Sequence, residues 1–131
     1  MSERATEDTL LAEAWRAREA AYAPYSNFPV GAAVLTASGQ IFSGANVENA
    51  SYGLSICAER TAIFAAVNAG ERRIQAIAVV TAAATATPPC GACRQVIWEF
   101  GRDAWVVAEN RPGERRHWTI RELLPNAFEF S

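Results

Sequence analysis

The three cysteines constrain the fold of this chain more than any other feature of its sequence. Cys57 is followed two residues later by Glu59, and Cys90 and Cys93 form a C-x-x-C pair about thirty residues further along. Thiolates are common zinc ligands, and a site with three protein ligands keeps an open position, as catalytic rather than structural zinc sites do. The sequence therefore predicts a zinc site, and the fold must bring the two cysteine segments together.

The composition is that of a compact protein and argues against two classes of partner. Half of the 131 residues are hydrophobic, the formal net charge is −2, and all twelve basic residues are arginines. This balance does not suit a long phosphate backbone, so we expect no nucleic-acid partner. No apolar run approaches the roughly 20 residues that cross a bilayer, so we expect no membrane partner.

The cysteine count and the first residues bear on the compartment. Three cysteines do not make a disulfide framework, which needs an even number and an oxidising environment. The first ten residues carry several charges and lack the basic and then apolar layout of a secretory signal. We therefore expect reduced thiols in a cytoplasmic protein.

Hydrophobic periodicity predicts alternating helices and strands in one domain that spans residues 1–131. The predicted helices cover residues 6–21, 57–69, 91–100 and 121–124, and the predicted strands cover 30–36, 41–46, 74–81, 104–108 and 118–120. A hairpin followed by alternating helices and strands indicates one mixed sheet with helices on its faces. Both cysteine segments begin helices, so they should meet at the same edge of this sheet.

A zinc ion with three thiolates has a formal charge of −1, which works against ionising a bound water. Two features of the sequence offset that charge. Each cysteine segment lies at a helix N-terminus, where the helix dipole favours a thiolate. Arg60 lies one turn from Cys57 and can donate a hydrogen bond to its sulfur, and Arg94 is a second candidate for the same task.

Glu59 and His117 are the remaining candidates near a metal. Glu59 opens the same helix as Cys57, where it can take a proton from a zinc-bound water and pass it to a leaving group; elsewhere such a glutamate is a solvated cap residue. His117, the only histidine, lies in a charged stretch. We expect it to be a surface residue rather than a fourth ligand.

Two loops contain candidate substrate contacts. Residues 24–29 include two prolines and Phe28, which can form a flat pocket wall, although a plain connector is the simpler interpretation. Residues 46–54 lead directly to Cys57 and include Asn46, Glu48 and Tyr52. A polar loop ahead of a helix is a common place for substrate contacts, and a solvated turn is the alternative.

Five segments taken together resemble the cytidine deaminase family, in its small homotetrameric form with a three-cysteine zinc. The segments are residues 22–33, 46–54, 57–62, 89–96 and 123–128. The resemblance implies a three-layer α/β/α sandwich around a five-stranded mixed sheet. It also implies that Cys57, Cys90 and Cys93 bind one zinc ion per subunit while Glu59 carries protons.

The activity implied by the resemblance is hydrolytic deamination in pyrimidine salvage. Zinc-bound hydroxide would attack C4 of free cytidine or 2'-deoxycytidine and release ammonia, giving uridine or 2'-deoxyuridine. Asn46 and Glu48 match the ribose-binding pair of the family, Phe28 matches a wall of the base pocket, and Ala58 is expected among the substrate-binding residues.

The resemblance also implies sites shared between subunits of a homotetramer. Tyr52 and Phe128 match residues that reach a neighbouring subunit's site in the family, where the phenylalanine stacks on the base. An apolar chain end that contains Phe128 has little use in a monomer tail.

Two other functions remain open from the sequence. One is a deaminase for another pyrimidine-like compound, such as an aminopyrimidine nucleoside antibiotic, or for a base in a nucleic acid. The Asn46 and Glu48 pair and the acidic balance speak against it. The other is a zinc module without activity, against which the missing fourth ligand and Glu59 count.

Overall fold

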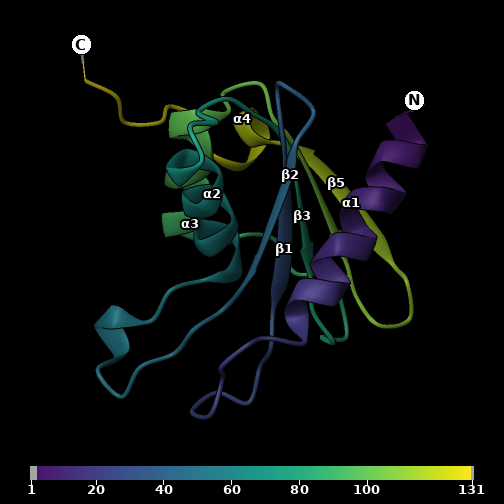
Figure 1. The fold of residues 1–131 in the computed structure, drawn as a ribbon, viewed down its shortest axis with the longest axis vertical. Coiled ribbons are helices and arrows are strands. Elements are labelled where there is room, and N and C mark those ends of the chain that lie inside the picture. Colours follow the sequence, from purple (N-terminus) through teal and green to yellow (C-terminus); the bar gives the residue numbers. More distant parts are fainter. Residues whose placement is uncertain (1–2, 131) are drawn as a thin grey trace.

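The computed structural model describes residues 3–130 and contains one five-stranded mixed sheet (Figure 1). The strands are β1 (Gly31–Thr36), β2 (Ile41–Ala45), β3 (Ile74–Val80), β4 (Trp105–Glu109) and β5 (Arg115–Thr119), in the spatial order β2-β1-β3-β4-β5. Strands β3 and β4 are parallel, and the other neighbouring pairs are antiparallel. The mixed sheet predicted from the sequence is confirmed.

Helices cover both faces of the sheet, which gives three layers (Figure 1). Helix α1 (Glu3–Arg18) lies on one face, and α2 (Ala58–Asn68), α3 (Gly91–Phe100) and the short α4 (Ile120–Leu123) lie on the other. A single 3-10 turn, η1 (Tyr52–Leu54), interrupts the long loop before α2. The predicted α/β/α sandwich is therefore confirmed.

Each face of the sheet has its own hydrophobic core. On the α1 side, Leu10, Leu11 and Ala14 are buried against small residues of β1 and β3. On the other side, Ile63 of α2 and Ile97 of α3 pack over the central strands. Buried positions recur three or four residues apart on each helix, as at Leu10 and Ala14 of α1, Ala58, Ala62 and Ala66 of α2, and Cys93 and Ile97 of α3, so a single apolar stripe of each helix meets the sheet.

Two glycines allow the helices to lie close to the sheet. A Cβ atom on Gly31 of β1 would lie 2.0 Å from the Ala14 carbonyl oxygen of α1. A Cβ atom on Gly44 of β2 would lie 2.8 Å from the Thr61 Cβ of α2. Any larger residue at these positions would push a helix off the sheet, so this spacing depends on glycine.

Most element boundaries lie within one residue of the sequence prediction, and α1 and β5 differ from it by three residues. Helix α1 was expected over residues 6–21 but ends at Arg18, because Tyr22 donates its N–H to the Asn46 carbonyl and draws the chain toward the 46–48 segment. Strand β5 was expected over 118–120 but begins at Arg115. As an edge strand it tolerates charged side chains that a buried strand would not.

The sheet topology brings the start of β1, the ends of β2 and β3, and the loop before α2 to the same end of the sheet. Gly31 pairs with Ala45 on one side and with Val80 on the other, so the carboxyl ends of β2 and β3 lie level. An antiparallel bridge between Val47 and Ile56 then returns the long loop to this edge, directly ahead of α2. Strand β3 continues through residues 81–90 into α3. Both helices that follow therefore begin at the same place.

None of the helices between residues 3 and 130 combines the length and the apolar character needed to span a membrane.

Candidate metal centre and active site

The three cysteine sulfurs meet where helices α2 and α3 begin. Their Sγ atoms all lie within 4.8 Å of one another, and those of Cys57 and Cys90 are 3.7 Å apart. All three cysteines are free of disulfides. Sulfurs bonded to a tetrahedral zinc ion at about 2.3 Å lie roughly 3.8 Å from each other, so the donor set and its spacing fit this metal.

Local backbone geometry explains why the sulfurs point together. Cys57 is the N-cap of α2 and Cys90 is the N-cap of α3, both with extended backbone and without a side-chain capping hydrogen bond. Cys93 lies one turn into α3 and is buried. The positive ends of two helix dipoles therefore converge on the cluster, and this favours the thiolate form of each ligand.

Arg60 adds a full positive charge beside the cluster. Its Nη2 atom donates a hydrogen bond of 3.3 Å to Cys57 Sγ, the contact that the sequence suggested. A hydrogen bond from the Cys93 thiol, and then the Arg60 contact, lower the pKa of Cys57 to about 5. The same Cys57 contact and burial raise the pKa of Cys93, so Cys57 is the first of the two sulfurs to ionise.

Glu59 is buried beside the cysteines. Only 4% of it is exposed, and this burial is the main reason that its pKa rises to about 7, with the charge of Cys57 adding to the effect. A carboxyl group whose pKa lies near neutral pH can both accept and return a proton. The electrostatics of the site are therefore those of a proton carrier.

A cavity of about 260 Å³ opens in front of Glu59 and two of the sulfurs. Seven of its lining residues were candidates from the sequence: Phe28, Asn46, Glu48, Cys57, Ala58, Glu59 and Cys90. Ser26, Val79, Thr81, Thr87 and Pro88 also line it and were not predicted. The position of Thr87 and Pro88 just before Cys90 was a signal that could have identified them.

Asn46 and Glu48 also hold the neighbouring loop of the cavity in place. The Asn46 side chain accepts a hydrogen bond from the Val30 N–H and donates one to the Phe28 carbonyl, at 2.9 and 3.0 Å. The Glu48 carboxylate accepts hydrogen bonds from the Ser26 hydroxyl and from two backbone N–H groups, and the Ser26 contact is the largest cause of its lowered pKa. Each side chain keeps further hydrogen-bonding capacity.

Tyr52 and Phe128 lie outside this cavity and are exposed. Tyr52 is 75% exposed and touches Tyr25 edge to face, while Phe128 is 68% exposed. Gln95 donates a hydrogen bond to the Phe128 carbonyl, which holds the end of the chain against α3. Within one chain, the structure therefore does not bring Phe128 to the cysteine cluster.

Arg94 and His117, the two other candidates near the cysteines, both have partners elsewhere. Arg94 donates hydrogen bonds to the Pro89 and Leu123 carbonyls, so the prediction that it faces a thiolate is wrong. These carbonyls lie close to it at the helix terminus, and they take up its donors. His117 lies 2.8 Å from Glu7 on the far side of the sheet and is not in the cysteine cluster, as expected.

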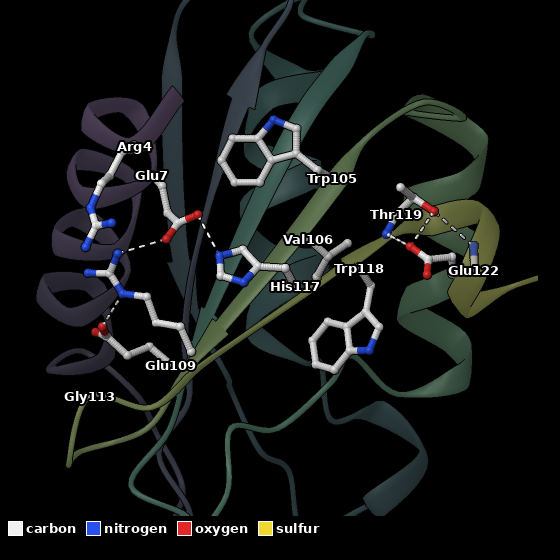
Figure 2. Close-up of a pocket in the computed structure, with 11 residues that line it drawn as sticks. Arg4, Glu7, Trp105, Val106, Glu109, Gly113, His117, Trp118, Thr119 and Glu122 are labelled. Atoms are coloured by element: carbon white, nitrogen blue, oxygen red, sulfur yellow. Dashed lines mark hydrogen bonds and ion pairs between the residues drawn. The ribbon is translucent and has the colours of Figure 1, made fainter. Parts of the chain in front are cut away.

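A larger groove of about 940 Å³ surrounds His117 between α1 and strand β5 (Figure 2). Glu7 on α1 reaches across to His117, and Trp105 lies on the sheet beside them (Figure 2). None of the predicted site residues lines this groove. The candidate site is therefore the smaller cavity, which Cys57, Cys90 and Glu59 line.

The comparisons with known proteins agree with this geometry, which is that of a zinc-dependent deaminase. Residues 4–109 match the model of the "Cytidine and deoxycytidylate deaminase zinc-binding region". A cytidine deaminase of Halalkalibacterium halodurans is 53% identical over 91% of each chain. A crystal structure of cytidine deaminase from Burkholderia pseudomallei superposes with a TM-score of 0.89 and 52% identity, covering 98% of this chain and 100% of that one. The chain thus belongs to the cytidine deaminase family of zinc-dependent enzymes.

A more distant relative is named for a different activity. A blasticidin-S deaminase of Bacillus cereus is 33% identical over 73% of this chain and 74% of its own. The family resemblance seen in the sequence is confirmed, and the range of activities within it is one reason to test the substrate directly.

Proposed function

We propose that this protein hydrolyses the C4 amino group of free cytidine and 2'-deoxycytidine, giving uridine or 2'-deoxyuridine and ammonia, as a step in pyrimidine salvage. The observation that carries the proposal is the single cavity onto which Cys57, Cys90 and Glu59 all open. Its volume of about 260 Å³ is near the lower end for small-molecule sites, which suits a nucleoside better than a polymer strand.

Cys57, Cys90 and Cys93 would hold one zinc ion per chain. When bound, the metal supplies a Lewis acid that activates water for attack on the pyrimidine ring. Arg60 offsets the negative charge of the thiolates through its hydrogen bond to Cys57, and the two helix N-termini act in the same direction. These three contributions offset the charge of an all-thiolate ligand set.

Glu59 moves the protons of the reaction. It takes a proton from the attacking water and gives it to N3 as the new bond to C4 forms. It then takes the remaining proton of the new C4 hydroxyl and gives it to the amino group, as the bond between C4 and nitrogen breaks and C4=O forms. Water and cytidine are thereby converted to uridine and ammonia without another reactant. The buried position of Glu59 at the cavity supports this role.

Asn46 and Glu48 bind the ribose, Phe28 forms a wall for the base, and Ala58 contributes at the floor beside Glu59. All four line the cavity. The carboxylate of Glu48 accepts hydrogen bonds from hydroxyl groups, and the amide of Asn46 both donates and accepts them, so together they suit a sugar diol.

Phe128 and Tyr52 act on the site of a neighbouring subunit in a homotetramer, where Phe128 stacks on the base. Their exposure in the single chain supports this assignment, since large apolar side chains at the surface favour a contact with another chain. The single domain over residues 1–131 and the cytoplasmic location stay predictions from the sequence.

Glu59→Gln tests the proton carrier. We expect kcat on cytidine to fall by about 100-fold to 10,000-fold, the range for loss of a general acid and base, while one zinc ion per chain is retained. The loss of cytidine absorbance and the metal content are measured on the same samples. Unchanged turnover in the variant would remove Glu59 from the mechanism, and a zinc-loaded wild type without turnover would favour the inactive zinc module.

The second candidate function is deamination of another aminopyrimidine nucleoside, which the similarity to a blasticidin-S deaminase favours. Cytidine, 2'-deoxycytidine, blasticidin S and a cytosine-containing single-stranded DNA are assayed at equal concentration. The proposal requires the highest kcat/KM on the two free nucleosides. A higher value on blasticidin S would replace it with the second candidate.

A further inference from the structure

The wall of the cavity next to Cys90 comes from a segment with little structure of its own. Residues 82–87 contain four alanines and two threonines and form no helix or strand. Yet this segment leads into Thr87 and Pro88, which line the cavity, and then into Cys90. Thr87 contacts the Thr81 hydroxyl and the Thr85 carbonyl through its side chain. The alanines offer no anchoring side chains, so the backbone around Ala84 and Ala86 must be fixed from elsewhere.

Both backbone groups of Ala86 are held by charged side chains near the end of the chain. Ala86 is fully buried, and its N–H donates to Glu114 Oε1 at 3.0 Å. Its carbonyl accepts a hydrogen bond of 3.1 Å from Arg116 Nη1. A buried backbone N–H or carbonyl without a partner is costly, so these two contacts determine where the segment can lie.

A third contact comes from Asn110, directly after β4. Asn110 is only 1% exposed, and its Nδ2 atom donates a hydrogen bond of 3.0 Å to the Ala84 carbonyl. Its Oδ1 atom accepts from the Glu114 N–H at 2.9 Å, and its own N–H donates to the Glu114 carbonyl. Asn110 therefore links the turn between β4 and β5 to the backbone of segment 82–87.

Arg116 is itself held in position. Its guanidinium lies 4.8 Å from the ring centroid of Trp118, which packs against the core below α3 and α4. A stacked guanidinium loses less freedom on forming its hydrogen bond than a free one would. The hydrogen bond to the Ala86 carbonyl is thus made by an arginine side chain whose freedom is already restricted.

We propose that the β4–β5 hairpin positions the Thr87 and Pro88 wall of the active-site cavity through Asn110, Glu114 and Arg116. These three are positioning residues, because they bind the backbone of residues 84–86 and do not line the cavity. The hairpin would thereby influence nucleoside binding from outside the cavity. The activity part of this inference rests on the proposed function, and the structural part does not.

Hydrogen–deuterium exchange of zinc-loaded protein tests the structural part. In Glu114→Ala the Ala86 N–H loses its acceptor, and we expect exchange in segment 82–87 to become faster by about tenfold or more. Glu114→Gln keeps an oxygen acceptor and should stay close to wild type. Glu19→Ala, an exposed glutamate without this contact, is the matched control. Unchanged exchange in Glu114→Ala would overturn the proposal.

Steady-state kinetics test the effect on the site. We expect KM for cytidine to rise by about threefold to tenfold in Glu114→Ala, with a smaller change in kcat, since the wall moves while Glu59 stays in place. In Glu114→Gln, which keeps an oxygen acceptor, KM should stay close to the wild-type value. A merely structural contribution would lower Tm without this division between KM and kcat.

Asn110→Asp is a second variant in case Glu114→Ala does not fold. It has nearly the shape of the wild-type residue, keeps the acceptor for the Glu114 N–H and removes the donor to Ala84. Faster exchange over 82–87 together with a raised KM supports the proposal, and wild-type values for both overturn it. Wild type inactive on cytidine would reject the proposed function, while the exchange experiment would still decide the structural part.

Discussion

The small cavity at the helix N-termini and the large groove beside β5 contain similar kinds of residue but arrange them differently. In the groove, Arg115 contacts Glu7, Asp8 and Glu109, and His117 contacts Glu7. Each of these side chains thus has a hydrogen-bonding or ion-pair partner. The groove is the larger of the two by volume, yet Glu7, Glu109 and Arg115 in it are occupied with holding α1 to the sheet.

In the small cavity the charged and nucleophilic groups face one another without such full pairing. Cys57 and Cys90 line it together with the buried carboxyl group of Glu59, and the Cys93 sulfur and Arg60 lie directly behind them. Such an arrangement is unfavourable unless a cation or a substrate completes it. Reactive groups without full partners, rather than the volume of a cavity, therefore distinguish the candidate site from the groove.

The largest expected difference between the two regions concerns metal binding. Cys90→Ala removes one of three ligands, so we expect zinc to be lost and activity to fall by more than about 1,000-fold. His117→Ala removes a residue of similar ligand chemistry from the groove and should keep both. Metal content and turnover are measured for each. Zinc retained in Cys90→Ala, or lost in His117→Ala, would break the comparison.

Arginine substitutions should separate function from stability. Arg60→Ala removes the donor to Cys57, and we expect activity or zinc affinity to fall by about 10-fold to 100-fold. Arg115→Ala removes the arginine that pairs with the largely buried Glu7 and Glu109 and leaves them only their contacts with His117 and Trp15, so it should lower stability by about 1–3 kcal/mol with kcat/KM unchanged. Urea unfolding and kinetics on both variants check this division. Equal activity losses in the two would contradict it.

The smallest expected effect concerns the pH dependence of binding. A hydrogen bond from Ser26 is the main reason that the pKa of Glu48 lies below 4.5, so Ser26→Ala should raise this pKa. A lowered pKa keeps the carboxylate charged to lower pH, and the variant loses that charge sooner as the pH falls. We expect the ratio of KM in Ser26→Ala to KM in wild type to grow by about twofold between pH 7 and pH 4.5.

Thr119→Ala is the matched control for the pH experiment. Thr119 holds the pKa of Glu122 down in the same way, through backbone and side-chain hydrogen bonds, but at the rim of the groove. Its loss removes a helix cap and should cost about 1 kcal/mol of stability. The KM ratio should not vary with pH in this variant. A flat ratio for Ser26→Ala as well would separate Glu48 from substrate binding.

Local patterns were sufficient to predict most of the fold. Helix α3 has the predicted bounds, because Pro88 and Pro89 fix its start and Gly101 follows its end. Strand β5 was placed three residues late, since the partners of Arg115 lie in α1 and β4 and no local pattern reveals them. Charged edge strands are therefore the elements that periodicity misses.

The site was predictable to a similar degree. Cysteine spacing located the metal cluster, and Arg60 was found because its partner is one helical turn away. Arg94 was assigned wrongly, since the competing Pro89 and Leu123 carbonyls come from the fold. Ser26, Glu114 and Asn110 act through contacts between distant segments. Such contacts need coordinates, because neither spacing nor residue type indicates them.

The central position of β3 has a consequence for the order of folding and metal binding. Cys57 precedes this strand and Cys90 follows it, so the two sulfurs become neighbours only after β3 has inserted between β1 and β4. Parallel pairing of β3 with β4 is a non-local event and is expected to be slow. Metal capture during refolding would thus be a late step. The rate of zinc uptake, measured with a zinc-sensitive dye during refolding, would therefore report the rate at which the sheet forms.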